Sequence, residues 1–151
     1  MDRCSRAMAG GCIALSLFIH GCGKEPPPAV VPVQGTVLLN GVPLPKAQIR
    51  LIPKIGYGAE YIATAVTDES GRFVLQCNGQ SGACATENTV LVTEADIPPE
   101  FQGENRQREL AVYLKSLKNR PIPQSYGSPV STPLQITVTK EQPEYKFELK
   151  R

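Results

Sequence analysis

Apolar and polar residues alternate along most of the chain after residue 32, and short polar turns interrupt the alternation. A period of two is typical of a strand with one face in the core and the other in solvent. Asn40 and Gly41 suit a two-residue hairpin that requires positive φ, while Asp68 and Gly71 frame a second tight turn before Phe73. The pattern predicts an all-β fold, a seven-stranded antiparallel β-sandwich. The predicted strands cover residues 33–39, 47–51, 61–67, 73–77, 90–96, 134–138 and 145–149.

One stretch between the fifth and sixth predicted strands has helical periodicity. Leu110, Tyr113, Leu114 and Leu117 recur at intervals that place them on one face of a helix, and Asn105 is positioned to cap its start. We therefore expect a short helical insertion with one apolar face. Two interpretations remain open: a lid packed on the edge of the sandwich, or a surface that binds a partner or a membrane. The four apolar residues are the candidate partner surface.

The N-terminal region has a different pattern. Residues 1–21 contain basic residues, then a short apolar run, then a small residue, which is the order of a secretory signal. Cys22 follows, and residues 19–22 resemble a lipobox, in which the cysteine is lipidated after cleavage, although His20 stands where a small residue is usual. The proline-rich residues 22–31 predict an extended lipidated tether, and residues 32–151 the domain.

This N-terminal order predicts a lipoprotein of the cell envelope, anchored in a membrane through its N-terminal lipid and facing the periplasm or the exterior. Secretion with cleavage at a nearby site and an uncleaved apolar anchor are the alternatives. The apolar part of the signal is too short to span a bilayer as a helix.

Charge and histidine content limit the classes of function that the chain can have. The chain has 16 basic and 14 acidic residues, and removal of Asp2, Arg3 and Arg6 with the signal leaves 14 and 13, a net charge near +1. A balanced charge argues against nucleic-acid binding. His20 is the only histidine and leaves with the signal, so nucleophiles activated by histidine and histidine-bound metals are excluded. We expect no enzymatic activity, no cofactor and no metal site.

Cysteine usage agrees with export. Cys77 and Cys84 are the cysteines that remain unmodified after cleavage and lipidation, with six residues between them. In an oxidising compartment such a pair tends to form a disulfide. Closing this small loop contributes about 2–3 kcal/mol by restricting the unfolded chain. We therefore predict a Cys77–Cys84 disulfide.

Motifs in three parts of the chain recur in the same order in a known family. QGTVLLNGVPLPKAQIRLIP spans residues 34–53 and TDESGRFVL spans residues 67–75. The closing region adds Ile122, Pro123, Tyr126, Thr132, Pro133 and Leu134, then Phe147 and Leu149. Together these segments resemble the transthyretin-like or carboxypeptidase regulatory-like domains, especially the small lipoproteins of planctomycete bacteria.

The resemblance covers most of residues 32–150 and implies a prealbumin-like Greek-key sandwich with a structural or adhesive role. The chain departs from the family pattern at two places. Ala85 precedes the fifth strand where glycine is usual, and Asn88 stands at the site of an aromatic residue. The helical insertion is also longer than the family's proline-rich linker.

These observations favour a non-catalytic envelope lipoprotein whose sandwich binds or spaces other envelope components, either protein or glycan. A carbohydrate-binding module is the first alternative, and it would need exposed aromatic side chains among Tyr57, Tyr61, Tyr126 and Tyr145. A hydrolase that works without histidine is the second. Its acidic candidates, near Asp68 and Asp96, are better explained as a turn and a strand end.

Overall fold

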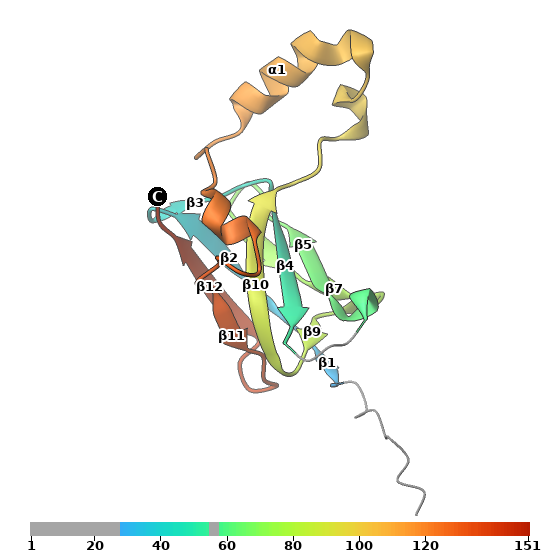
Figure 1. Ribbon diagram of the computed structural model, residues 1–151, viewed down its shortest axis with the longest axis vertical. Helices are drawn as coiled ribbons and strands as arrows, with labels where there is room; N and C mark the ends of the chain where they lie inside the picture. Colours follow the sequence, from blue (N-terminus) through green and yellow to red (C-terminus); the bar gives the residue numbers. More distant parts are fainter. Residues whose placement is uncertain (1–27, 55–57) are drawn as a thin grey trace, which may run out of the picture.

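The chain folds mainly into β-strands that form several sheets, with most neighbouring strands antiparallel (Figure 1). The computed structural model describes residues 28–54 and 58–151. The predicted signal, Cys22 and all but the last residues of the predicted tether lie outside the described residues. The all-β prediction is confirmed at this level.

The larger sheet has six strands, in the order β11-β10-β4-β5-β7-β8. Its centre is the antiparallel pair β4–β10, which stays in register from Ala47 opposite Glu94 to Pro53 opposite Asn88. Inward-facing residues of β4 are fully buried at every second position, as the sequence alternation predicts. The strands are β4 (Ala47–Pro53), β5 (Ala63–Val66), β7 (Gln76–Cys77), β8 (Gln80–Ser81), β10 (Glu87–Glu94) and β11 (Gln135–Thr137).

The second sheet is built around β2 (Gln34–Leu39), which pairs with β3 (Val42–Pro43), β6 (Arg72–Val74) and β12 (Glu144–Leu149). The pairing of β12 with β2 is parallel. The expectation of a purely antiparallel fold is therefore wrong for this pair. Alternation reports which face of a strand is buried, but it does not report the direction of the neighbouring strand.

Side chains from both sheets form one buried cluster. Val37 and Leu39 of β2 lie in it with Ile49 and Leu51 of β4, all with no exposed area. A hydroxyl group also links the two sheets at their margin, because the Tyr145 hydroxyl of β12 donates to the carbonyl of Thr137 in β11 over 3.1 Å. The sheets are therefore joined by shared apolar packing and by this hydrogen bond.

A short strand joins the N-terminal region to the domain. β1 (Val30–Val31) pairs antiparallel with β9 (Ala83–Cys84). Val31 is 4% exposed and belongs to the core cluster. The domain therefore begins within the predicted tether, because a pair of valines supplies a strand partner for β9.

Both predicted turns are present. Asn40 and Gly41 have φ values of 52° and 78° and connect β2 to β3. In the second turn the Asp68 carboxylate accepts hydrogen bonds from the backbone N–H groups of Ser70 and Arg72, at 2.8 and 2.9 Å. Gly71 has φ of 73°, and a Cβ there would lie 2.6 Å from the carbonyl oxygen of Val37.

Phe73 follows the second turn and packs in the core, where its ring stacks on that of Phe147 at a centroid distance of 5.6 Å. Thus the turn residues and Phe73 have the structural roles that the sequence predicts for them. Asp68 and Phe73 also line a cavity of about 480 Å³ beside β2 and β6.

Helical segments connect the strands. The short 3-10 helices are η1 (Ala59–Tyr61), η2 (Pro99–Phe101), η3 (Glu104–Arg106) and η4 (Gln124–Gly127). The predicted helix is present as α1 (Gln107–Ser116), which lies between β10 and β11. Asn105 does not cap it, because this residue lies inside η3 and α1 has no side-chain cap.

Candidate functional site

The insertion, defined as residues 95–118, leaves the β-domain at one end and places α1 beyond the sheets, whereas β1 enters at the opposite end (Figure 1). No residue of α1 is buried, and its principal contacts are with η2 and η3 of the same insertion. The helix is therefore not a lid packed on the sheet edge, and its role in binding stays a prediction.

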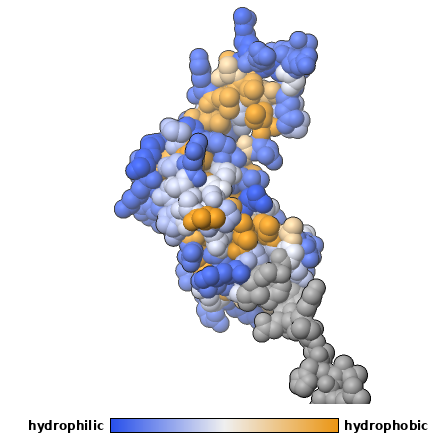
Figure 2. Space-filling model, in the orientation of Figure 1, coloured by the Kyte–Doolittle hydropathy of each residue, from blue (hydrophilic) through white to orange (hydrophobic). Residues whose placement is uncertain are grey.

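Apolar side chains of the insertion are exposed, and Figure 2 shows them gathered on the face seen in that view. Val112 is 65% exposed, Leu114 47% and Ile97 37%. Leu110 and Leu117 are half-buried. Of the predicted partner surface, Leu114 is thus the most open member. Val112 was missed because it lies off the periodic face.

Tyr113 turns toward the base of the insertion. Its ring stacks on that of Phe101 with centroids 4.6 Å apart, and the Lys46 ammonium lies 5.3 Å from its centre. Lys46 also pairs with the carboxylate of Glu69 at 3.7 Å. A cation over an aromatic face contributes about 0.5–1 kcal/mol at an exposed site. Tyr113 is therefore the member of the predicted surface that holds the helix in place.

A cavity of about 510 Å³ separates the insertion from the larger sheet. Most of its wall is apolar, and Lys46 and Gln48 lie on the sheet side. The insertion thus touches the sheet through a few side chains and leaves space beneath it. The cavity is lined by Lys46, Gln48, Val66, Ala95, Asp96, Pro98, Glu100, Phe101 and Tyr113.

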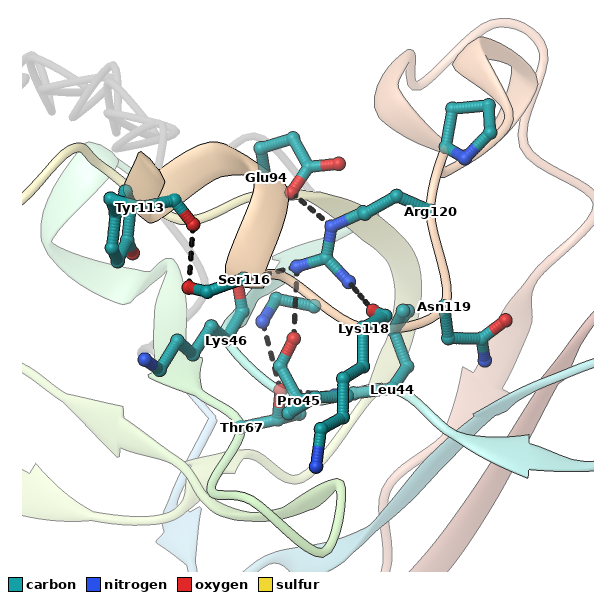
Figure 3. Close-up of polar contacts among 12 residues, drawn as sticks. Leu44, Pro45, Lys46, Thr67, Glu94, Tyr113, Ser116, Lys118, Asn119 and Arg120 are labelled. Carbon is teal, nitrogen blue, oxygen red and sulfur yellow. Dashed lines mark hydrogen bonds and ion pairs between the residues drawn. The ribbon is translucent and has the colours of Figure 1, made fainter. Parts of the chain in front are cut away.

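Arg120 fixes the two ends of the insertion to each other and to the β-domain (Figure 3). Its Nε donates to the Glu94 carboxylate at 2.6 Å, where β10 ends. Nη2 donates to the carbonyls of Pro45 and Lys46, at 2.9 and 3.1 Å, and Nη1 to that of Lys118 at 2.9 Å. The side chain is only 14% exposed. A planar fork of donors suits this arrangement, which a single ammonium group could not reproduce.

Asn119 makes a second attachment. Its φ is 59°, and its side-chain amide donates to the carbonyls of Leu39 and Val42 at 3.0 Å each. Arg151 donates in turn to the Asn119 side-chain oxygen at 3.1 Å. The sequence contains no signal for Asn119 or Arg120, because most of the groups they bind, at Leu39, Val42, Pro45 and Lys46, lie more than 70 residues away in the chain. The apolar side chains of the insertion are therefore exposed, while hydrogen bonds from Asn119 and Arg120 attach its base to the β-domain.

The predicted Cys77–Cys84 disulfide is not formed in the structure, where both residues are free thiols with no exposed area. The Cys77 thiol donates to the carbonyl of Glu60 over 3.6 Å, and the Cys84 thiol to that of Tyr61 over 3.8 Å. Burial raises the pKa of both thiols, and the neighbouring Cys77 adds to the effect on Cys84, whose pKa rises to about 11. The thiolate, which is the nucleophilic form, is therefore disfavoured at both cysteines.

Two of the tyrosines considered for sugar binding are packing residues. Tyr126 and Tyr145 are each 7% exposed, so their faces are not open to a sugar ring. Tyr61 is half-buried, and Tyr57 lies outside the described residues. Within residues 28–54 and 58–151, no three histidine, cysteine or acidic side chains cluster as a metal site would need.

Among the described helices, none has both the length and the apolar character to cross a bilayer. No family model, curated protein or solved structure matches the chain. The features of the structure that bear on function are therefore the exposed insertion, its attachment through Arg120 and Asn119, and the position of β1 at the far end.

Proposed function

We propose that the chain is a non-catalytic envelope lipoprotein, anchored through a lipid on Cys22, whose β-domain presents the helical insertion to another envelope protein. One observation carries the proposal: α1 has no buried residue, although apolar side chains cover much of its surface. An exposed apolar patch of this kind marks a surface that another molecule covers.

The energetics favour a protein partner over an unoccupied helix. Transfer of a side chain such as Val112 or Leu114 out of water stabilises by about 1.5–3 kcal/mol. Within the described residues, no segment covers these two side chains, so this stabilisation is not realised. Because Arg120 and Asn119 hold the base of the insertion, a partner would lose little conformational entropy on ordering it.

The placement of the anchor supports the same proposal. β1 is the first described strand, and α1 lies at the opposite end of the β-domain (Figure 1). Residues 23–29 between Cys22 and β1 span at most about 25 Å when fully extended. A lipid on Cys22 would therefore hold the domain near the membrane by one end and leave the insertion free at the other.

Photo-cross-linking in the native envelope tests the partner surface. A benzophenone amino acid at Leu114 should join the chain to the same protein in repeated experiments. The yield should fall at least about tenfold when Ala111, an exposed residue three positions earlier on the same side of α1, is changed to glutamate, because a charge buried by the partner costs several kcal/mol. The same probe at Lys140, an exposed position on the β-domain, is the matched control. Equal labelling from Leu114 and Lys140 would contradict the proposal.

The anchor is tested separately. Cys22→Ser removes the thiol that would carry the lipid, so the protein should move from the membrane fraction to the soluble fraction. Cys84→Ser is the matched control, since Cys84 is buried in the β-domain. Unchanged membrane association of the Cys22→Ser protein would refute lipid anchoring while leaving the partner surface untouched.

We also infer that the two principal sheets form a transthyretin-like Greek-key sandwich with seven main strands. The single core cluster with members from both sheets supports this arrangement, as does the Tyr145–Thr137 hydrogen bond between them. Each of the seven predicted strand regions contains a strand. In this sandwich β6 and β7 together form the fourth main strand, which passes from one sheet to the other, and β1, β3, β8 and β9 are short additions at its margins.

A further inference from the structure

β12 is an unpaired edge of the second sheet. It pairs with β2 on one side, and among the described strands none pairs with its other side. The other strands at sheet edges, β3, β6, β8 and β11, are two or three residues long, whereas β12 has six. A cavity of about 540 Å³ opens between β11 and β12. Long free edges of this kind are templates for pairing with another chain.

The backbone of β12 shows which groups are free. The carbonyls of Pro143 and Leu149 accept hydrogen bonds from the β2 side, both at 2.9 Å. Because successive residues direct their backbone groups to opposite sides, the even-numbered residues of β12 face the open edge. At the end of the strand, the Tyr126 hydroxyl accepts a hydrogen bond from the Lys150 N–H at 2.9 Å and donates one to the Lys150 carbonyl at 3.4 Å. The preceding even-numbered positions remain open.

The side chains on the outer face of β12 alternate in charge: Glu144, Lys146, Glu148 and Lys150. All four are exposed, and none forms an ion pair within the described part of the chain. We propose that β12 pairs antiparallel with β12 of a second copy, with Phe147 at the twofold axis. Lys146 then lies opposite Glu148 of the second copy. Glu144 reaches the end of the partner strand, where the Tyr126 hydroxyl already binds the backbone of Lys150.

Charge and overlap together select this register. Centring the pair on Tyr145 or on Leu149 also sets unlike charges opposite each other, but it pairs only residues 144–146 or 148–150 of the two strands. Centring the pair on Lys146 would set that lysine against itself and Glu144 against Glu148, and centring it on Glu148 would set Lys146 against Lys150. Like charges directly opposite are destabilising. Shifting the second strand by one residue from any of these registers would place inward-facing residues of one copy opposite outward-facing residues of the other. In the Phe147 register, Lys146 and Glu148 of the other copy form a hydrogen-bonded pair that exchanges both backbone bonds.

The twofold axis of this dimer runs perpendicular to the sheet, so the two copies point in opposite directions along their strands. Each insertion then lies at an outer end, away from the shared edge (Figure 1). The two β1 strands lie at opposite ends of the dimer, so lipids on both copies share one membrane when the sheet lies along its surface. The inference rests on β12 alone and does not require that the insertion binds a partner.

Charge exchange tests the pairing in the full, lipidated chain solubilised in detergent, followed by sedimentation velocity over a range of concentrations. Lys146→Glu and Glu148→Lys each place like charges opposite one another twice, so each should raise the dimer dissociation constant at least about tenfold. An equal mixture of the two variants should dimerise again. In the mixed dimer the glutamate introduced in one copy lies opposite the lysine introduced in the other, and the unchanged Glu148 lies opposite the unchanged Lys146.

Lys140→Glu is the matched control, since it reverses an exposed lysine outside β12 and should leave dimerisation unchanged. Restoration in the mixture distinguishes direct pairing from a general effect of the substitutions on folding. A wild-type chain that stays monomeric at every concentration would overturn the inference. So would a dimer that neither variant weakens, or a mixture that fails to associate.

Discussion

Thr67→Val tests how the β-domain holds residues 44–47, the segment that includes the Pro45 and Lys46 carbonyls bound by Arg120. The Thr67 hydroxyl accepts a hydrogen bond from the backbone N–H of Ala47 at 2.9 Å and donates one to the carbonyl of Leu44 at 2.7 Å (Figure 3). Thr67 is 3% exposed. Valine has nearly the same shape, so the substitution removes both hydrogen bonds without opening a cavity.

The expected loss follows from these contacts. Each buried group left without a partner costs about 1–3 kcal/mol, and the added methyl group recovers about 0.8 kcal/mol. We expect Thr67→Val to lower the free energy of unfolding by about 3 kcal/mol. For a urea m-value of about 1.5 kcal/mol/M, the unfolding midpoint falls by about 2 M.

Urea unfolding followed by circular dichroism measures the change. Thr67→Ser keeps the hydroxyl and removes one methyl group, so it should cost about 1 kcal/mol. A Thr67→Val protein that loses less than about 1 kcal/mol would refute the reasoning. It would mean that water or another group satisfies the two backbone partners.

Three further predictions concern other parts of the molecule. Gly82→Ala should disrupt the pairing of β1, because Gly82 has φ of 128° and a Cβ there would lie 1.9 Å from the Val31 carbonyl oxygen. Hydrogen exchange at the Val31 amide measures the loss of pairing. Gly79→Ala is the milder control, since a Cβ at Gly79 would meet no atom within 4 Å. Arg120→Lys should speed proteolysis within residues 95–118, because one ammonium group cannot hold the partners of the guanidinium; cleavage at the wild-type rate would contradict that role. Iodoacetamide at pH 8 should modify Cys84 at least about 100-fold more slowly in the folded protein than in urea. The reason is that a pKa of about 11 rather than 9.0 lowers the thiolate fraction by that factor. Equal rates in the two states would contradict the burial of Cys84. The raised pKa also means that stability falls as pH rises from 9 toward 11, where the unfolded chain releases this proton and the folded chain retains it.

Local features were predictable from the sequence where the physics is local. The Asn40–Gly41 hairpin depends on two residues that tolerate positive φ. The Asp68 turn depends on a carboxylate within reach of its own backbone. The boundaries of α1 were less predictable, because the adjoining η3 replaced the expected cap at Asn105.

Contacts between distant segments could not be predicted in this way. Arg120 reaches Pro45 and Lys46 only because β4 and β10 are neighbours in the sheet. The side-chain amide of Asn88 donates to the carbonyls of Cys84 and Thr86, at 3.1 and 2.7 Å. No periodicity encodes such pairs, because their sequence separation bears no relation to their distance in the fold.

The sequence by itself determined the strand regions, the two tight turns, the amphipathic character of residues 107–116 and the absence of histidine after the predicted signal. Each depends on a residue and its near neighbours. Tertiary structure alone decided that α1 lies beyond the sheets with no buried residue, that β12 runs parallel to β2, and that β12 has a free edge among the described strands. These depend on which segments meet in space, because an apolar face requires burial but does not specify what buries it.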